Sequence, residues 1–143
     1  MIIDAQVTSR ILDAATEVHS ALGPGLLENT YAKCLARELR EAGIKVDTEV
    51  AINIEYKGLV LDSAYRLDLV VADAVVVEIK SVDRLLPVHG SQVLTYLRFS
   101  GLRFGLLLNF NVHRLKLGIR RFVRDRHGSP VAPVDTPCSP CPP

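Results

Sequence analysis

The sequence predicts a single α/β domain in which helices pack on a mixed sheet, with elements in the order ααβββαβ. Three observations predict this fold. Apolar residues recur at helical spacing over residues 3–22. Residues 44–58 then alternate apolar and polar side chains, as a half-buried strand does. Two further apolar runs, near 60–71 and 75–82, lie close enough along the chain to join as hairpins.

Glycine and proline mark where the early elements end. Gly-Pro-Gly at 23–25 breaks the first helical pattern. A second helix is predicted from about Leu26 to Ala42, and Gly43 supplies its stop signal. Lys57-Gly58 predicts a tight turn between two strands.

The later elements follow the same logic. Pro87 is suited to the first turn of a third helix, which ends near Ser100-Gly101. The run RFGLLLNF, residues 103–110, predicts a short buried strand. Residues 114–123, RLKLGIRRFV, predict a final strand or a short helix.

Length and composition suit one globular domain. The chain has 143 residues, of which 48% are hydrophobic and 23% charged. We assign residues 1–124 to the domain and 125–143 to a tail that holds six of the eight prolines and is predicted to be disordered. Membrane spans need roughly 18–20 apolar residues in a row, and no run approaches that length. The N-terminus lacks the apolar core of a signal peptide, so we expect a cytoplasmic protein without membrane contact.

The three cysteines do not predict a metal or redox site. Cys34 falls in a helical stretch and is expected to act as a small buried hydrophobe. Cys138 and Cys141 form a CxxC pair among prolines, but no second pair completes a zinc site.

The charge is unevenly distributed along the chain. Residues 1–97 carry nine basic and fourteen acidic side chains, whereas residues 98–126 carry eight basic ones and one acid. A basic end of this kind is typical of a surface that meets a polyanion. A solvated surface without a partner is the alternative that charge alone leaves open.

The apolar strands within residues 65–82, YRLDLVVADAVVVEIKSV, are interrupted by Asp68, Glu78 and Lys80. Side chains alternate across a strand, so Glu78 and Lys80 share one face of theirs. A tight loop over 72–74 would pair residue 70 with 76 and would set Asp68 opposite Glu78. A shift of one residue would move Asp68 among apolar neighbours, so this register is favoured.

Two facing carboxylates repel each other unless one is protonated or a cation lies between them. Carboxylate oxygens suit Mg²⁺ or Mn²⁺, and the Lys80 ammonium on the same face could stabilise charge on a phosphate. The alternative is a sheet whose second face is wet, where these residues are solvated.

The predicted helices add polar groups to apolar stripes. Glu28 lies on the stripe of the second helix, near its N-terminus, where a carboxylate is favoured in any case. On the third helix, the polar residues His89, Gln92 and Tyr96 lie three or four residues apart. This spacing places them on the same face as the apolar Val93 and Leu97. A hydrogen-bonded core network would also explain His89.

These motifs together resemble a known family. Residues 25–31, GLLENTY, match the signature of the GxxExxY proteins, which belong to the PD-(D/E)xK nuclease superfamily. The resemblance extends over about residues 5–123 and includes VHSALGPGLLENTY, YRLDLVV, VEIKSV, PVHGSQVLTYL and LLLNFN. It implies a restriction-endonuclease-like fold, with a mixed sheet flanked by helices. Tyr31 is the tyrosine of the signature.

The resemblance assigns the strand residues to a metal site. Asp68 matches the metal-binding aspartate of the superfamily, and Glu78 and Lys80 match its ExK as second ligand and catalytic lysine. The proline of the superfamily's name has no counterpart here, since residues 65–67 are Tyr-Arg-Leu.

The resemblance also assigns the helices. Glu28 matches a first-helix glutamate that helps to hold the metal or its waters. Gln92 and Tyr96 match the QxxxY of a helicase-associated branch, on a helix that lines the active site. His19 and His89 lie in similar contexts without an assigned role.

We therefore expect metal-dependent hydrolysis of phosphodiester bonds in DNA or RNA. Asp68 and Glu78 would hold Mg²⁺ or Mn²⁺, together with Glu28 and the Ile79 carbonyl, and the basic segment 98–126 would bind backbone phosphates. One alternative is a catalytically inactive nuclease-like module that binds nucleic acid or a protein. Another is a subunit of a homo-oligomer or of a larger assembly.

Overall fold

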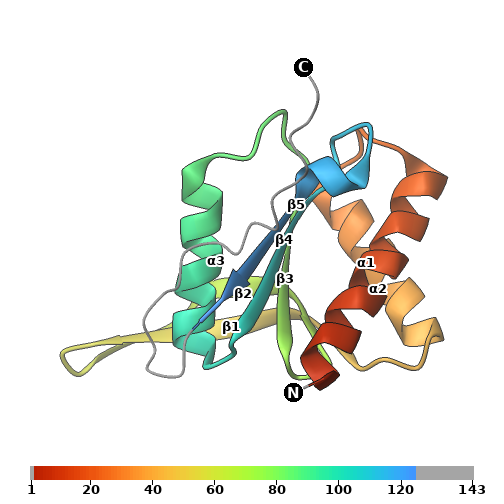
Figure 1. Cartoon of the computed structure of the whole chain (residues 1–143). Coiled ribbons are helices and arrows are strands. Elements are labelled where there is room, and N and C mark those ends of the chain that lie inside the picture. The colour runs from red at the N-terminus through yellow and green to blue at the C-terminus, as the bar shows by residue number, and fades with distance from the viewer. Residues whose placement is uncertain (1, 125–143) are drawn as a thin grey trace.

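The computed structural model describes residues 2–124, and the predicted tail lies outside that range. A five-stranded sheet in this part of the chain separates two layers of helix, with α1 and α2 on one face and α3 on the other (Figure 1). None of the described helices is long and apolar enough to cross a bilayer. The elements are α1 (Ile2–Leu22), α2 (Glu28–Glu41), β1 (Val46–Tyr56), β2 (Leu59–Val71), β3 (Val75–Lys80), α3 (Pro87–Ser100), β4 (Phe104–Asn109), the 3-10 helix η1 (Leu115–Gly118) and β5 (Ile119–Val123).

The sheet is mixed, as the sequence predicts. Its strands lie in the order β1-β2-β3-β4-β5, and only the β3–β4 pair among the described strands is parallel. Parallel neighbours need a crossover, and α3 provides it. The segment 114–123, predicted as a strand or a short helix, forms both, because η1 turns the chain into β5.

Two apolar clusters hold the helices on the sheet. Ile11, Leu35 and Phe110 belong to the cluster under α1 and α2. Val93 and Phe122 belong to the cluster under α3. The strand β3 is buried on both faces and contributes to both clusters, so a charged side chain on it enters an apolar environment.

The predicted register of β2 with β3 is confirmed next to the turn, but the predicted strand pair of Asp68 with Glu78 does not form. Val70 pairs with Val76, and residues 72–74 form the loop between the strands. Ala72 and Asp73 both have φ of 53°, the left-handed region that tight hairpin turns require. The register sets Leu69 opposite Val77, and the ladder ends with that pair.

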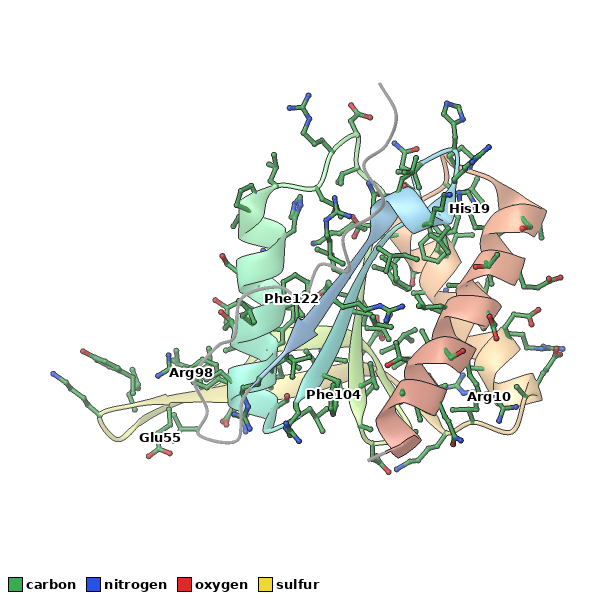
Figure 2. All side chains as sticks on the ribbon, in the orientation of Figure 1. Arg10, His19, Glu55, Arg98, Phe104 and Phe122 are labelled. Carbon is green, nitrogen blue, oxygen red and sulfur yellow. The ribbon has the colours of Figure 1, made fainter. Side chains whose placement is uncertain are left out.

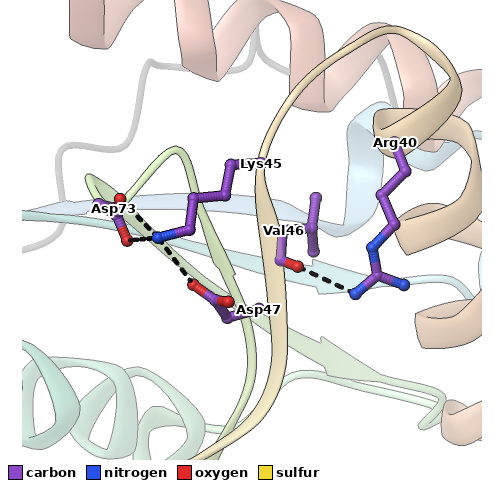
Figure 3. Close-up of polar contacts among 5 residues, drawn as sticks. All are labelled: Arg40, Lys45, Val46, Asp47 and Asp73. Carbon is purple, nitrogen blue, oxygen red and sulfur yellow. Dashed lines mark hydrogen bonds and ion pairs between the residues drawn. The ribbon is translucent and has the colours of Figure 1, made fainter.

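The β2–β3 turn is also joined to the start of β1 (Figure 3). The Lys45 ammonium lies 2.9 Å from both carboxylate oxygens of Asp73 and 3.7 Å from Asp47. The Ala72 N–H donates to the Lys45 carbonyl at 2.8 Å. These charged side chains are mostly exposed, so the backbone bond and the turn conformation contribute more to the register than the ion pairs do.

Close packing of α3 on β4 depends on Gly105. A Cβ at this position would lie 2.7 Å from Val93 Cγ1 and 3.4 Å from Leu97 Cδ1. Gly105→Ala is therefore expected to lower the free energy of unfolding by about 2 kcal/mol, although alanine is normally the better strand residue. Urea denaturation monitored by circular dichroism measures the change. In a Val93→Ala background the same substitution should cost less, because the methyl that it meets is gone, and equal costs would contradict this account.

Candidate active site

The site begins where β2 and β3 separate. Beyond the Leu69–Val77 pair, the Ile79 N–H donates to Asp68 Oδ2 at 2.8 Å in place of a backbone carbonyl of β2. The strand β3 nevertheless continues to pair with β4 as far as Lys80 and Asn109. The Asp68 side chain thus occupies a fork between two strands and is fixed by a charge-assisted hydrogen bond.

The Glu78 carboxyl lies on the same side of the fork as Asp68. Glu78 is 5% exposed, and its partner in β4, Leu107, belongs to the apolar cluster under α3. Burial is the largest cause that raises the pKa of the Glu78 carboxyl to about 9; a hydrogen bond with Asp68 and the charge of Asp68 contribute to this rise, whereas Lys80 acts in the opposite direction. The two carboxyls are thus in contact through their side chains, although the strand ladder ends before residues 68 and 78.

Two buried acceptors, one of them in this pair, lack donors. Glu78 Oε2 and Gln92 Oε1 are buried and have no hydrogen-bond partner in the described part of the chain. A buried carboxylate oxygen without a partner is costly, and a cation or a cation-bound water would satisfy it. This observation fits a divalent metal ion at the fork.

Tyr96 reaches the carboxyl pair from α3. Burial raises the pKa of the Tyr96 hydroxyl to about 12, with the charges of Glu78 and Asp68 and a hydrogen bond to Glu78 as further causes. The ring of Tyr65 on β2 lies 5.8 Å from that of Tyr96. The third helix thus brings Tyr96 to the carboxyl pair.

Lys80 and Ile79 complete the end of β3. Lys80 is half-buried, and no ion pair with a described side chain, residues 5–124, involves its ammonium. The Phe110 N–H donates to the Lys80 carbonyl at 2.9 Å. The Ile79 side chain belongs to the cluster under α1 and α2, so only its backbone can face the fork.

Glu28 approaches the fork from the other helical layer. Its Oε1 accepts from the Ser81 N–H at 3.4 Å, and its charge adds to the rise in the pKa of Glu78, after burial and Asp68. Glu28 and Asp68 also line a cleft of about 570 Å³ between α2 and the β1–β2 pair. The cleft wall includes Glu49, whose φ of 50° is strained for a residue with a side chain.

The acidic residues do not form a closed cage. No group of three or more Asp, Glu, His or Cys side chains within residues 5–124, whose side chains the structure describes, is close enough to hold an ion. Two carboxylates with water and substrate oxygens suit Mg²⁺, which keeps several waters, better than they suit a metal that needs four protein ligands.

Neither histidine lies free at the fork. His19 Nε2 lies 2.7 Å from the Val112 carbonyl, at the C-terminal end of α1. His89 Nδ1 accepts from the Leu86 N–H at 2.9 Å and so caps α3. This contact is local and exposed, so it is a helix cap and not the hydrogen-bonded core network that was the alternative for His89.

The basic residues of 98–126 are divided between two ends of the sheet. Arg124 donates to the carbonyls of Arg98 and Gly101, where α3 ends and β4 begins, and Arg98 lies beside that end of α3 in Figure 2. Arg114 and Lys116 are exposed around η1, after β4 has ended. Arg126 lies outside the described residues.

Two residues around the fork have no place in the sequence prediction. Ser81 contacts both Glu28 and the Leu26 carbonyl. The buried Asn109 amide bonds both backbone groups of Val82, at 3.1 Å and 2.9 Å. The sequence carries one signal for Asn109: a polar residue directly follows three leucines at the end of an apolar run, which indicates a buried polar side chain.

The family comparison agrees with this geometry. A model of the PD-(D/E)XK nuclease superfamily matches residues 5–122. The chain belongs to the PD-(D/E)XK nuclease superfamily. No curated protein and no solved structure matches it significantly. The mixed sheet between helical layers is that of the restriction-endonuclease-like fold.

The raised pKa of Glu78 predicts how the stability of the metal-free protein depends on pH. The folded protein keeps the proton up to about pH 9, whereas the unfolded chain releases it near the ordinary value of 4.5. Glu78 therefore favours unfolding progressively as the pH rises through this window, by at most about 1.4 kcal/mol per unit. Glu78→Gln removes the titrating group, so its stability should fall less between pH 5 and pH 8. Urea denaturation in EDTA measures both slopes, and equal slopes would show that Glu78 is not protonated in the fold.

Proposed function

We propose that the protein is a metal-dependent nuclease that hydrolyses phosphodiester bonds of nucleic acid with Mg²⁺ or Mn²⁺. The observation that carries the proposal is the pair of the half-buried Asp68 and the buried Glu78, with an unpartnered Glu78 oxygen, beside an ammonium without an ion pair. Membership of a nuclease superfamily supports it independently.

Asp68, Glu78 and the Ile79 carbonyl would hold the ion, and Glu28 would reach it through water. When bound, such an ion lowers the pKa of a water and polarises a phosphoryl oxygen. The hydrogen bond from Ile79 keeps the Asp68 carboxylate oriented, and burial keeps bulk water away from Glu78.

Three side chains act on the substrate or on the carboxylates. The Lys80 ammonium orients the attacking water or stabilises the charge that develops on the phosphate. The Tyr96 hydroxyl donates to Glu78 and fixes its rotamer. The Gln92 amide offers an acceptor to a bound water.

The substrate backbone would approach from the η1 end of the sheet. The Phe110 N–H is bonded to the Lys80 carbonyl, which places Phe110 beside the fork. Arg114 and Lys116 follow Phe110 at η1, whereas Arg98 and Arg103 come before β4, so the η1 pair lies nearer the fork. Such contacts bind phosphates with little dependence on base sequence.

A second candidate function is a nuclease-like module that binds nucleic acid or a protein without cutting. The observation in its favour is that no third acidic side chain among residues 5–124 joins Asp68 and Glu78 closely enough to hold an ion. The two candidates differ in whether nucleic acid is cleaved when metal is supplied.

Asp68→Asn tests catalysis with the least structural disturbance, because an amide oxygen can still accept from the Ile79 N–H. We expect this variant and Lys80→Met to lower kcat by about 100-fold or more with Mg²⁺ or Mn²⁺, while circular dichroism stays that of the wild type. The assay is a panel of single- and double-stranded DNA and RNA.

Asp62→Asn, an exposed change on the same strand, is the matched control and should leave cleavage intact. Mn²⁺ should raise the melting temperature of the wild type and of the control, but not that of Asp68→Asn. Wild-type cleavage by Asp68→Asn or Lys80→Met would contradict the assignment, and binding without cleavage on every substrate would favour the second candidate.

The division of the arginines predicts which charges bind the substrate. Replacing Arg114 and Lys116 with glutamine should weaken binding and reduce the slope of log affinity against log salt by about one per charge. The control replaces Arg98 and Arg103, which should change the slope less. Fluorescence anisotropy across a salt series measures both pairs, and a larger effect from the control pair would place the substrate at the other end of the sheet.

A further inference from the structure

The phenol of Tyr31 is bonded to both ends of the loop that precedes α2. Its hydroxyl donates to the Gly23 carbonyl at 2.5 Å and accepts from the Leu26 N–H at 3.1 Å. Gly23 and Gly25 have φ of 69° and 99°, conformations that suit glycine. The hydroxyl therefore fixes a turn that ends directly before Glu28.

The same loop contacts the end of β3. Ser81 Oγ donates to the Leu26 carbonyl at 2.6 Å, and the Ser81 N–H donates to Glu28 Oε1 at 3.4 Å. Ser81 follows Lys80 in the chain. A displacement of the loop would consequently move the Glu28 carboxylate and loosen the backbone next to Lys80.

Tyr31 itself is rigidly held. It is fully buried, and its ring stacks on Phe110 with a centroid distance of 4.5 Å and an interplanar angle of 13°. The Phe110 N–H donates to the Lys80 carbonyl at 2.9 Å. The ring thus packs on Phe110, beside the end of β3, and the hydroxyl holds the loop before α2.

We propose that Tyr31 is a positioning residue, whose hydroxyl holds the loop so that Glu28 stands at the fork with Asp68 and Glu78. This inference rests on the proposed metal-dependent function. It accounts for the Gly25, Glu28 and Tyr31 spacing, since the glycine permits the turn, the glutamate is presented and the tyrosine fixes both. A residue that only filled the core would need the ring and not the hydroxyl, yet both hydrogen bonds of the hydroxyl go to the loop.

Tyr31→Phe tests the hydroxyl while keeping the ring on Phe110. Hydrogen exchange is expected to become about fivefold faster at the Leu26 and Ser81 amides, because one loses its acceptor and the other its neighbour. Ser81→Ala should weaken the same contact from the opposite side. Val18→Ala is the control, since it removes buried methyl groups from the same cluster without touching the loop.

Mn²⁺ binding by calorimetry tests the consequence of positioning. Tyr31→Phe and Ser81→Ala should each weaken Mn²⁺ binding about tenfold, as loss of an outer-shell contact does, and Val18→Ala should not. In a Glu28→Gln background, Tyr31→Phe should have little further effect, because the hydroxyl acts through Glu28.

Unchanged exchange at Leu26 and Ser81 in Tyr31→Phe would overturn the inference, as would a loss of Mn²⁺ affinity that adds fully to that of Glu28→Gln. If the wild-type protein binds no Mn²⁺, the proposed function fails and the metal-related role of Tyr31 fails with it. The exchange measurement would still show separately whether the hydroxyl holds the loop.

Discussion

The hydrogen bond from the Ile79 N–H to Asp68 creates the fork on which the site depends. A β ladder normally satisfies every inward backbone group with a backbone partner. Here the Asp68 side chain takes that place just beyond the last β2–β3 pair, Leu69 with Val77, and the two strands separate. The carboxylate that separates the strands is also the first candidate ligand, so the local break in the sheet and the chemistry of the site have the same cause.

Burial of Glu78 is the electrostatic consequence of that arrangement. The strand β3 is covered on both faces, and its neighbour in β4 at this position is a leucine. An ionised carboxylate there, opposite another carboxylate, is costly without a cation. The fold therefore holds a destabilising pair in place through the packing around it, as functional sites commonly do.

That packing comes from both helical layers. Gly105 has no side chain and so allows α3 to pack closely on the sheet, and α3 brings Tyr96 to Glu78. On the opposite layer, the stacked rings of Tyr31 and Phe110 link the loop before α2 to the end of β3. The site thus lies at the end of the central strand β3, where elements distant in the chain meet, and each element is fixed by contacts of its own.

The sequence by itself determined the elements, the β2–β3 register and the face shared by Asp68, Glu78 and Lys80. These follow from periods of two and 3.6 residues and from tight turns, which are local properties of the chain. It did not determine where the β2–β3 ladder ends or that Ser81 contacts Glu28. Nor did it determine that His89 caps its own helix, or that the basic residues of 98–126 lie at two ends of the sheet. Only the tertiary structure decided those, because strand separation, burial and side-chain partners depend on packing between segments far apart in sequence.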